Sequence, residues 1–86
     1  MKPPPLDPDK LTKEQIFEYL LRAISTDIVM WLMRDNGLSL QEALSTWYNS
    51  TTFEKVSDPL TGMYIESSGY NSDWLKRELV TGRFQP

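Results

Sequence analysis

The sequence predicts an all-α fold, a small three-helix domain whose first helix is long. Apolar residues recur at spacings of three and four over residues 13–36, the pattern of one face of an α-helix. Two capping boxes, of the form Ser/Thr-x-x-Glu/Gln, lie directly before apolar segments and predict helix starts. The one β-like segment, Met63–Ile65, has no second strand to pair with, so it does not predict a sheet.

The first helix is predicted to begin at about Lys13, because Thr12 and Gln15 match a capping box. Asn36-Gly37 ends it, since glycine takes the left-handed conformation that closes a helix. Ser25–Asp27 could divide the segment in two. We expect one continuous helix, because no Gly or Pro interrupts it and no Glu or Gln follows these residues at the third position. Its apolar face is Ile16, Phe17, Leu20, Leu21, Ile24, Ile28, Trp31 and Leu32.

A second helix is predicted over about Leu40–Asn49, because Ser39 and Glu42 form the second capping box. The residues expected on its buried face are Leu40, Ala43, Leu44, Trp47 and Tyr48. The segment that follows, residues 49–58, predicts a short helical turn that carries Phe53 and Val56.

The sequence DPLTG at residues 58–62 predicts a turn. Pro59 presets its own φ, and Gly62 permits the positive φ with which the chain leaves such a turn. Met63–Ile65 is then expected to be an extended connector into a tyrosine-rich loop that turns at Gly69.

The last helix is predicted over about Asp73–Val80, with Ser72 or Asn71 as its cap and Thr81-Gly82 as its end. Trp74, Leu75 and Leu79 are expected to be its buried residues. The chain thus divides into a flexible proline-rich arm at residues 1–10, a single helical domain at residues 11–82 and a tail at residues 83–86.

The composition argues against an enzyme. The chain has no Cys and no His, so it has neither a zinc site of the usual ligands nor a Ser-His or Cys-His nucleophile. No phosphate-binding, dinucleotide-binding or calcium-binding motif is present, and the acidic pairs lie in predicted loops. We therefore expect no catalytic residues, no metal and no cofactor.

Nucleic-acid binding is also disfavoured. The net charge is −3, and the basic residues are scattered except for Lys76-Arg77. Residues 33–48, MRDNGLSLQEALSTWY, have the outline of a DNA-binding helix-turn-helix. However, the positions that would contact bases hold Gln41 and Glu42, and no basic residue accompanies them. A plain helical hairpin is the preferred interpretation.

No membrane partner is expected either. The longest apolar run, Ile28–Met33, is far shorter than the roughly 20 residues that a membrane-spanning helix needs. The first ten residues lack the apolar core of a secretory signal. These features and the absence of cysteine predict a soluble, cytoplasmic protein.

The second half of the first helix suggests an interaction surface. A polar stripe on its first half is expected to face water, and by helical turns it continues into Val29 and Met33. The stripe consists of Glu14, Glu18, Arg22 and Ser25. The second half is therefore apolar nearly all round, which means that other helices surround it or that a partner covers part of it. We favour the first explanation and keep Val29, Met30 and Met33 as the candidate surface. The leading functional hypothesis is a module that binds another protein or itself.

A second candidate site is the corner formed by Tyr64, Tyr70 and Trp74. Aromatic side chains with one polar end are common in ligand pockets, so a small-ligand-binding or regulatory domain is the alternative function. The competing interpretation is that these rings pack the loop onto the last helix, and a small domain favours it.

Residues 58–75 also carry a resemblance, in Asp58-Pro59-x-Thr61-Gly62, Met63-Tyr64, Ser67, Gly69-Tyr70 and Leu75. They resemble a family of small uncharacterised bacterial helical proteins, classified only as a domain of unknown function. The likeness covers about residues 24–79 and departs at Ser68, where a proline is common. It implies an accessory or antitoxin-like binding role and carries over no site residues.

Overall fold

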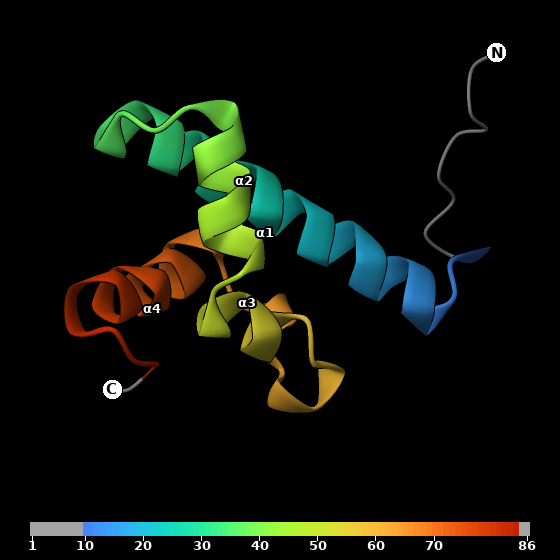
Figure 1. The fold of residues 1–86 in the computed structure, drawn as a ribbon. Helices are drawn as coiled ribbons and strands as arrows, with labels where there is room; N and C mark the ends of the chain where they lie inside the picture. Colours follow the sequence, from blue (N-terminus) through green and yellow to red (C-terminus); the bar gives the residue numbers. More distant parts are fainter. Residues whose placement is uncertain (1–9, 85–86) are drawn as a thin grey trace, which may run out of the picture.

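A computed structural model describes residues 10–84, and it confirms the all-α fold (Figure 1). The described residues form four α-helices and two single turns of 3₁₀-helix, with no strand. Residues 1–9 of the expected arm and residues 85–86 of the expected tail lie outside the described range. The elements are α1 (Lys13–Asn36), α2 (Leu40–Tyr48), α3 (Thr51–Val56), η2 (Pro59–Thr61), η3 (Met63–Ile65) and α4 (Ser68–Thr81).

The long helix α1 is continuous, as expected. Thr12 and Gln15 make both hydrogen bonds of the capping box, and Gly37 closes the helix with φ of 66°. Ser25–Asp27 does not break it. The Thr26 hydroxyl donates to the Arg22 carbonyl one turn earlier at 2.9 Å, so this side chain is satisfied without disturbing the backbone.

The second capping box is formed as well. Ser39 and Glu42 exchange backbone and side-chain hydrogen bonds at the start of α2. The backbone N–H of Ser39, and then its hydroxyl, hold the pKa of the Glu42 carboxyl below its ordinary value. A lowered pKa means that this contribution to stability is present above the unfolded-state pKa and is lost as the pH falls through the folded one.

The core lies along one side of α1. Ile24, Ile28 and Leu32 point into it, and they meet Trp47 from α2 and Leu75 from α4. The Trp47 indole N–H donates to the Ser25 hydroxyl at 2.8 Å, and both side chains are buried. The expectation that Ser25 faces water was therefore wrong, because Ser25 accepts this hydrogen bond inside the core. A buried N–H that keeps a partner avoids a desolvation penalty of roughly 1–3 kcal/mol, so this bond fixes where α2 crosses α1.

Helix α3 is held by a carboxylate from α4. Glu78 accepts hydrogen bonds from the backbone N–H groups of Thr51 and Thr52 at 2.9 and 2.7 Å. It also accepts from the Thr52 hydroxyl at 2.8 Å. A six-residue helix is too short to be stable alone, and a carboxylate at its N-terminus satisfies N–H groups that lack helical partners. Glu78 therefore joins α3 to α4.

Two expectations about the segment before α4 were wrong. Met63–Ile65 forms the 3₁₀ turn η3 rather than an extended connector. Helix α4 begins at Ser68, five residues earlier than predicted, and its cap is Ser67 rather than Ser72 or Asn71. Gly69 and Tyr70 therefore lie within α4, and only the first part of the tyrosine-rich segment is a connector.

The early start of α4 has a tertiary cause. The Ser67 hydroxyl accepts from the Tyr70 backbone N–H at 3.0 Å, while Asn71 is fully buried. The Asn71 side-chain amide donates to the carbonyls of Met63 and Ser67 at 2.9 and 3.1 Å. Because Asn71 bonds to both η3 and the first turn of α4, it ties these two turns together.

Several side chains expected in the core are instead partly exposed. On α2, Ala43 and Trp47 are buried, whereas Leu40, Leu44 and Tyr48 lie on a neighbouring strip open to solvent. Leu79 of α4 and Ile16 of α1 are also exposed. In each helix the apolar face is wider than the surface that another element covers.

We expect Trp47→Phe to lower the free energy of unfolding by about 2–3 kcal/mol, because it opens a cavity and removes the donor to Ser25. Urea denaturation followed by far-UV circular dichroism measures the loss. Ser25→Ala should lower the free energy of unfolding by less in the Trp47→Phe background than in the wild-type chain, since the indole donor to Ser25 is already missing there. Equal costs in the two backgrounds would contradict the coupling.

Glu78→Ala should lower the free energy of unfolding by about 2 kcal/mol or more, because it leaves the backbone N–H groups of Thr51 and Thr52 without their acceptor. The matched control is Glu54→Ala, on the exposed side of α3, which should change it by no more than about 0.5 kcal/mol. Equal losses for the two variants in urea denaturation would show that Glu78 does not hold α3.

Candidate interaction surface

The face of α1 that points away from the core carries a regular row of exposed residues. They recur at alternating spacings of three and four, so they lie in line along the helix. All six are exposed in the structure, and we call them the outer stripe: Ile16, Tyr19, Ala23, Thr26, Met30 and Met33. This spacing is the heptad pattern with which two helices pack side by side.

Of the three residues of the predicted surface, one is buried and two are exposed. Val29 is only 7% exposed and belongs to the core cluster, whereas Met30 is 54% exposed and lies opposite the buried face. Met33 is 38% exposed and lies one turn further along the outer stripe. Of the other four stripe residues, Ile16 was assigned from the sequence to the apolar face that packs in the core. Tyr19, Ala23 and Thr26 were not proposed as surface residues, although their heptad spacing is visible in the sequence.

Small and charged residues shape the middle of the outer stripe. Ala23 and Thr26 leave a shallow hollow of about 440 Å³ between Tyr19, Arg22 and Asp27. Arg22 borders the stripe on one side and Asp27 on the other. Within the described chain the Arg22 guanidinium forms no ion pair, while one Asp27 carboxylate oxygen accepts from the Ser68 hydroxyl at 2.6 Å.

The aromatic corner predicted from the sequence is spread over separate contacts. Tyr64 packs edge-on against Phe17, with ring centroids 4.8 Å apart. Trp74 stacks on Phe84 at 4.5 Å, so part of the expected tail packs against α4. No described ring contact joins Tyr64, Tyr70 and Trp74 to one another.

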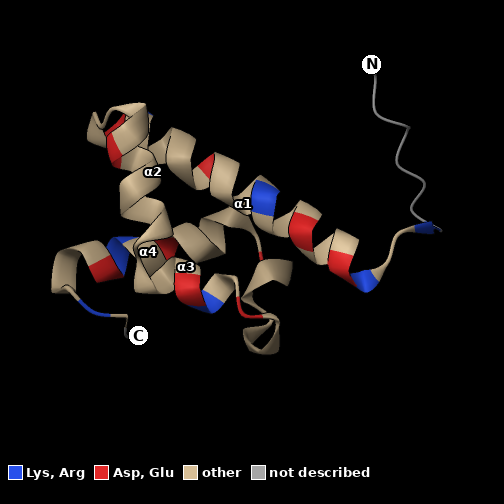
Figure 2. Cartoon of the chain, turned by 45° about the vertical axis from the view of Figure 1, so that its right-hand side comes forward, with Lys and Arg blue, Asp and Glu red and all other residues tan. Residues whose placement is uncertain are grey.

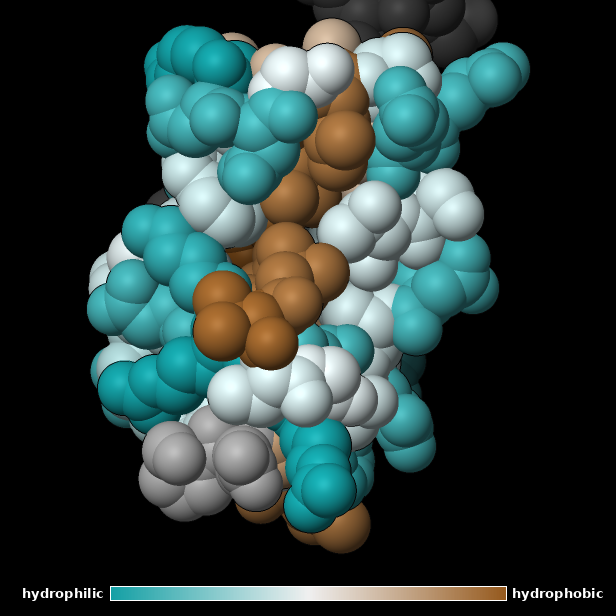
Figure 3. Space-filling view, turned by 60° about the vertical axis from the view of Figure 1, so that its left-hand side comes forward, coloured by the Kyte–Doolittle hydropathy of each residue, from teal (hydrophilic) through white to brown (hydrophobic). Residues whose placement is uncertain are grey.

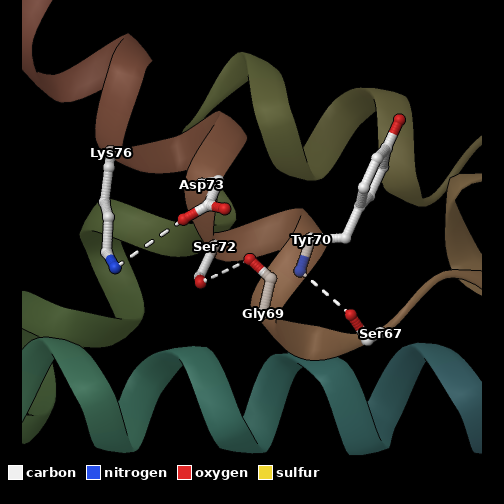
Figure 4. A network of polar contacts seen from close by, with 6 residues as sticks. All are labelled: Ser67, Gly69, Tyr70, Ser72, Asp73 and Lys76. Carbon is white, nitrogen blue, oxygen red and sulfur yellow. Dashed lines mark hydrogen bonds and ion pairs between the residues drawn. The ribbon is translucent and has the colours of Figure 1, made fainter.

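Tyr70 itself is 44% exposed, and Figure 4 shows its side chain pointing away from α1. The polar contacts around it belong to the start of α4. Ser72 donates to the Gly69 carbonyl at 3.0 Å, and Lys76 lies 3.8 Å from the Asp73 carboxylate (Figure 4). These are contacts within one helix, so they do not build a binding site around Tyr70.

A hollow of about 240 Å³ lies beside Tyr64, bordered by Lys13, Glu14, Phe17 and Pro59. Across the described residues, no three acidic side chains gather as a metal site would require. Likewise, no helix among them is both long and apolar enough to cross a membrane.

A second apolar area lies at the end of the bundle. Figure 3 shows a band of hydrophobic residues bordered by hydrophilic ones on the side of the molecule where α4 ends. In the last turn of α4, Val80 is 85% exposed, and Leu79 before it is 48% exposed. These two neighbours lack the regular spacing of the outer stripe, so they do not form a seam for a helix.

Charge is distributed without a basic face along α1. Figure 2 shows Lys and Arg positions interspersed with Asp and Glu along the helix. At the start of α2, Glu42 is engaged with Ser39 in the capping box, and no basic side chain stands beside Gln41 in the sequence.

Comparison with known proteins adds no relative: no protein-family model, curated protein or solved structure matches this chain. The resemblance carried by residues 58–75 therefore stays a prediction.

A pair of neighbouring substitutions tests the division of α1 into a core face and an outer face. Val29→Ala should lower the free energy of unfolding by about 1–2 kcal/mol, because it leaves a cavity beside the buried cluster. Met30→Ala should change it by no more than about 0.5 kcal/mol, since that side chain is largely in water. Urea denaturation at low protein concentration measures both, and the reverse order would contradict the assignment.

Proposed function

We propose that this domain is a non-enzymatic protein–protein interaction module that binds through the outer stripe of α1. One observation carries the proposal: a row of exposed side chains at heptad spacing lies directly opposite the core face of the same helix. Apolar side chains in a continuous row on a soluble surface are typical of interaction sites. The proposed role lies in the cytoplasm, in keeping with a chain that has no cysteine.

The shape of this face suits a helix as the partner element. The stripe spans 18 residues from Ile16 to Met33, and its two ends lie about 26 Å apart along the helix at a rise of 1.5 Å per residue. The hollow at Ala23 and Thr26 lets another backbone approach closely, and the larger side chains on either side supply contact area. An amphipathic helix docked along such a face makes contacts at each turn.

The alternative functions have weaker support. A small-ligand role for the Tyr64, Tyr70 and Trp74 corner rests on the hollow beside Tyr64 alone, because the other two side chains lie elsewhere. A DNA-binding role for α2 has no basic side chain at the helix start to support it. The accessory or antitoxin-like role implied by the resemblance agrees with an interaction module and names no partner.

A photo-crosslinking amino acid in place of Tyr19 tests the proposal in cells of the native host. We expect it to give a discrete crosslinked species, because Tyr19 lies in the middle of the proposed contact. The same amino acid at Gln41, exposed on α2, is the matched control and should give none. The Tyr19 product should also disappear when Met33→Glu is added to the same chain. A product from Gln41 alone, or none from either position, would contradict the proposal.

A further inference from the structure

We infer that the partner is a second copy of this chain, with the two α1 helices paired in parallel and in register along their outer stripes. This inference rests on the proposed function and adds the identity of the partner and the orientation of the contact. Its basis is the chemistry of the stripe and of the charges that border it.

The heptad assignment follows from the exposed residues. Ile16, Ala23 and Met30 take the first core position of successive heptads, and Tyr19, Thr26 and Met33 take the second. In a parallel pair each of these side chains meets its own copy. The core of each domain already holds α1 as a helix, so pairing does not have to pay for helix formation.

The bordering charges select the parallel orientation. In a parallel pair, the residue that directly precedes a first core position lies beside a residue of the other chain whose number is five higher. Arg22 directly precedes Ala23, a first core position. This brings Arg22 of each copy next to Asp27 of the other, so two pairs of opposite charge form by symmetry. Asp27 keeps one carboxylate oxygen for this contact, because only the other accepts from Ser68.

The antiparallel arrangement is less favourable. The antiparallel register that pairs all six stripe residues brings Lys13 of each copy beside Arg34 of the other, which repel. It also leaves Arg22 beside Val29, with no acid to meet its charge. Charged residues at these bordering positions commonly decide helix orientation, so the parallel pair is preferred.

The centre of the stripe fits close contact between two identical helices. Ala23 and Thr26 would each meet their own copy there, and small side chains allow the two backbones to approach. The Thr26 hydroxyl already donates to the Arg22 carbonyl, so it can be covered without a partner across the interface. Methionines at one end adapt their shape to each other because the side chain is unbranched.

Solution mass by light scattering tests the self-association, over about 1 μM to 1 mM, the range in which pairs of micromolar affinity dissociate. The wild-type chain should change from monomer to dimer within it. Met30→Glu should raise the dissociation constant at least about tenfold, because the two introduced carboxylates face each other. Leu60→Glu, an exposed apolar position away from the stripe, is the matched control and should leave it unchanged. Far-UV circular dichroism should show that both variants are folded.

Single cysteines test the orientation, since the chain has none of its own. In a parallel pair Met33→Cys meets its own copy and should form a disulfide-linked dimer under mild oxidation. An antiparallel pair would instead place Met33→Cys beside Ile16→Cys and link a mixture of these two variants. Leu60→Cys should give only the slow linkage of random collision.

These experiments distinguish self-association of α1 from binding to a different protein. A wild-type monomer at every concentration overturns the second copy as partner, while a Tyr19 crosslink to a different protein leaves the interaction module standing. Dissociation by Val80→Glu but not by Met30→Glu places the contact at the end of α4 and overturns the outer stripe. Preferential linkage of the Ile16→Cys and Met33→Cys mixture overturns the parallel orientation.

Discussion

The hydrogen bond from the Trp47 indole to Ser25 sets the position at which α2 crosses α1, and the later elements build from that crossing. Phe53 of α3 packs edge-on against the same Trp47 ring, with centroids 5.4 Å apart. Glu78 then attaches α4 to the N-terminus of α3. Because each attachment starts from the one before it, the three shorter helices gather on the Trp47 side of α1.

This one-sided assembly explains why the outer stripe stays in water. Helix α1 is 24 residues long, whereas α2, α3 and α4 have nine, six and fourteen residues. Because these three shorter helices lie on one side of α1, they leave its other side uncovered. Ile16 and Met30 lie outside the buried cluster, so the packing of this core does not require them to be apolar. The domain therefore keeps a second apolar face whose burial would contribute stability, and pairing with another helix is the means that its spacing fits.

The features that could be predicted from sequence are those decided within a few residues. The capping boxes before α1 and α2 and the glycine after α1 depend on local hydrogen bonds, so these boundaries could be placed. The start of α4 could not, because Ser67, Asn71 and Ser72 are all acceptable caps. The burial of Asn71 against the carbonyls of η3 decided between them. The outer stripe could be found only in part: Met30 and Met33 were in the predicted surface, whereas Ile16 was assigned to the core face. The placement of α2 and α4 decides which apolar positions of α1 are covered and which stay exposed.

Most of the aromatic side chains stabilise the domain itself, so they do not support an interaction role. Three Trp, three Phe and four Tyr are many for a chain of 86 residues, yet most of them pack against one another. Phe17 pairs with Tyr64, Phe53 with both Trp47 and Tyr48, and Trp74 with Phe84. Such pairs add contact area to a core that a short chain cannot make large. The outer stripe instead carries methionine, isoleucine and small residues with a single tyrosine. The case for a partner therefore depends on the spacing of the exposed residues of α1 and on the charges beside them, and the number of aromatic rings adds nothing to it.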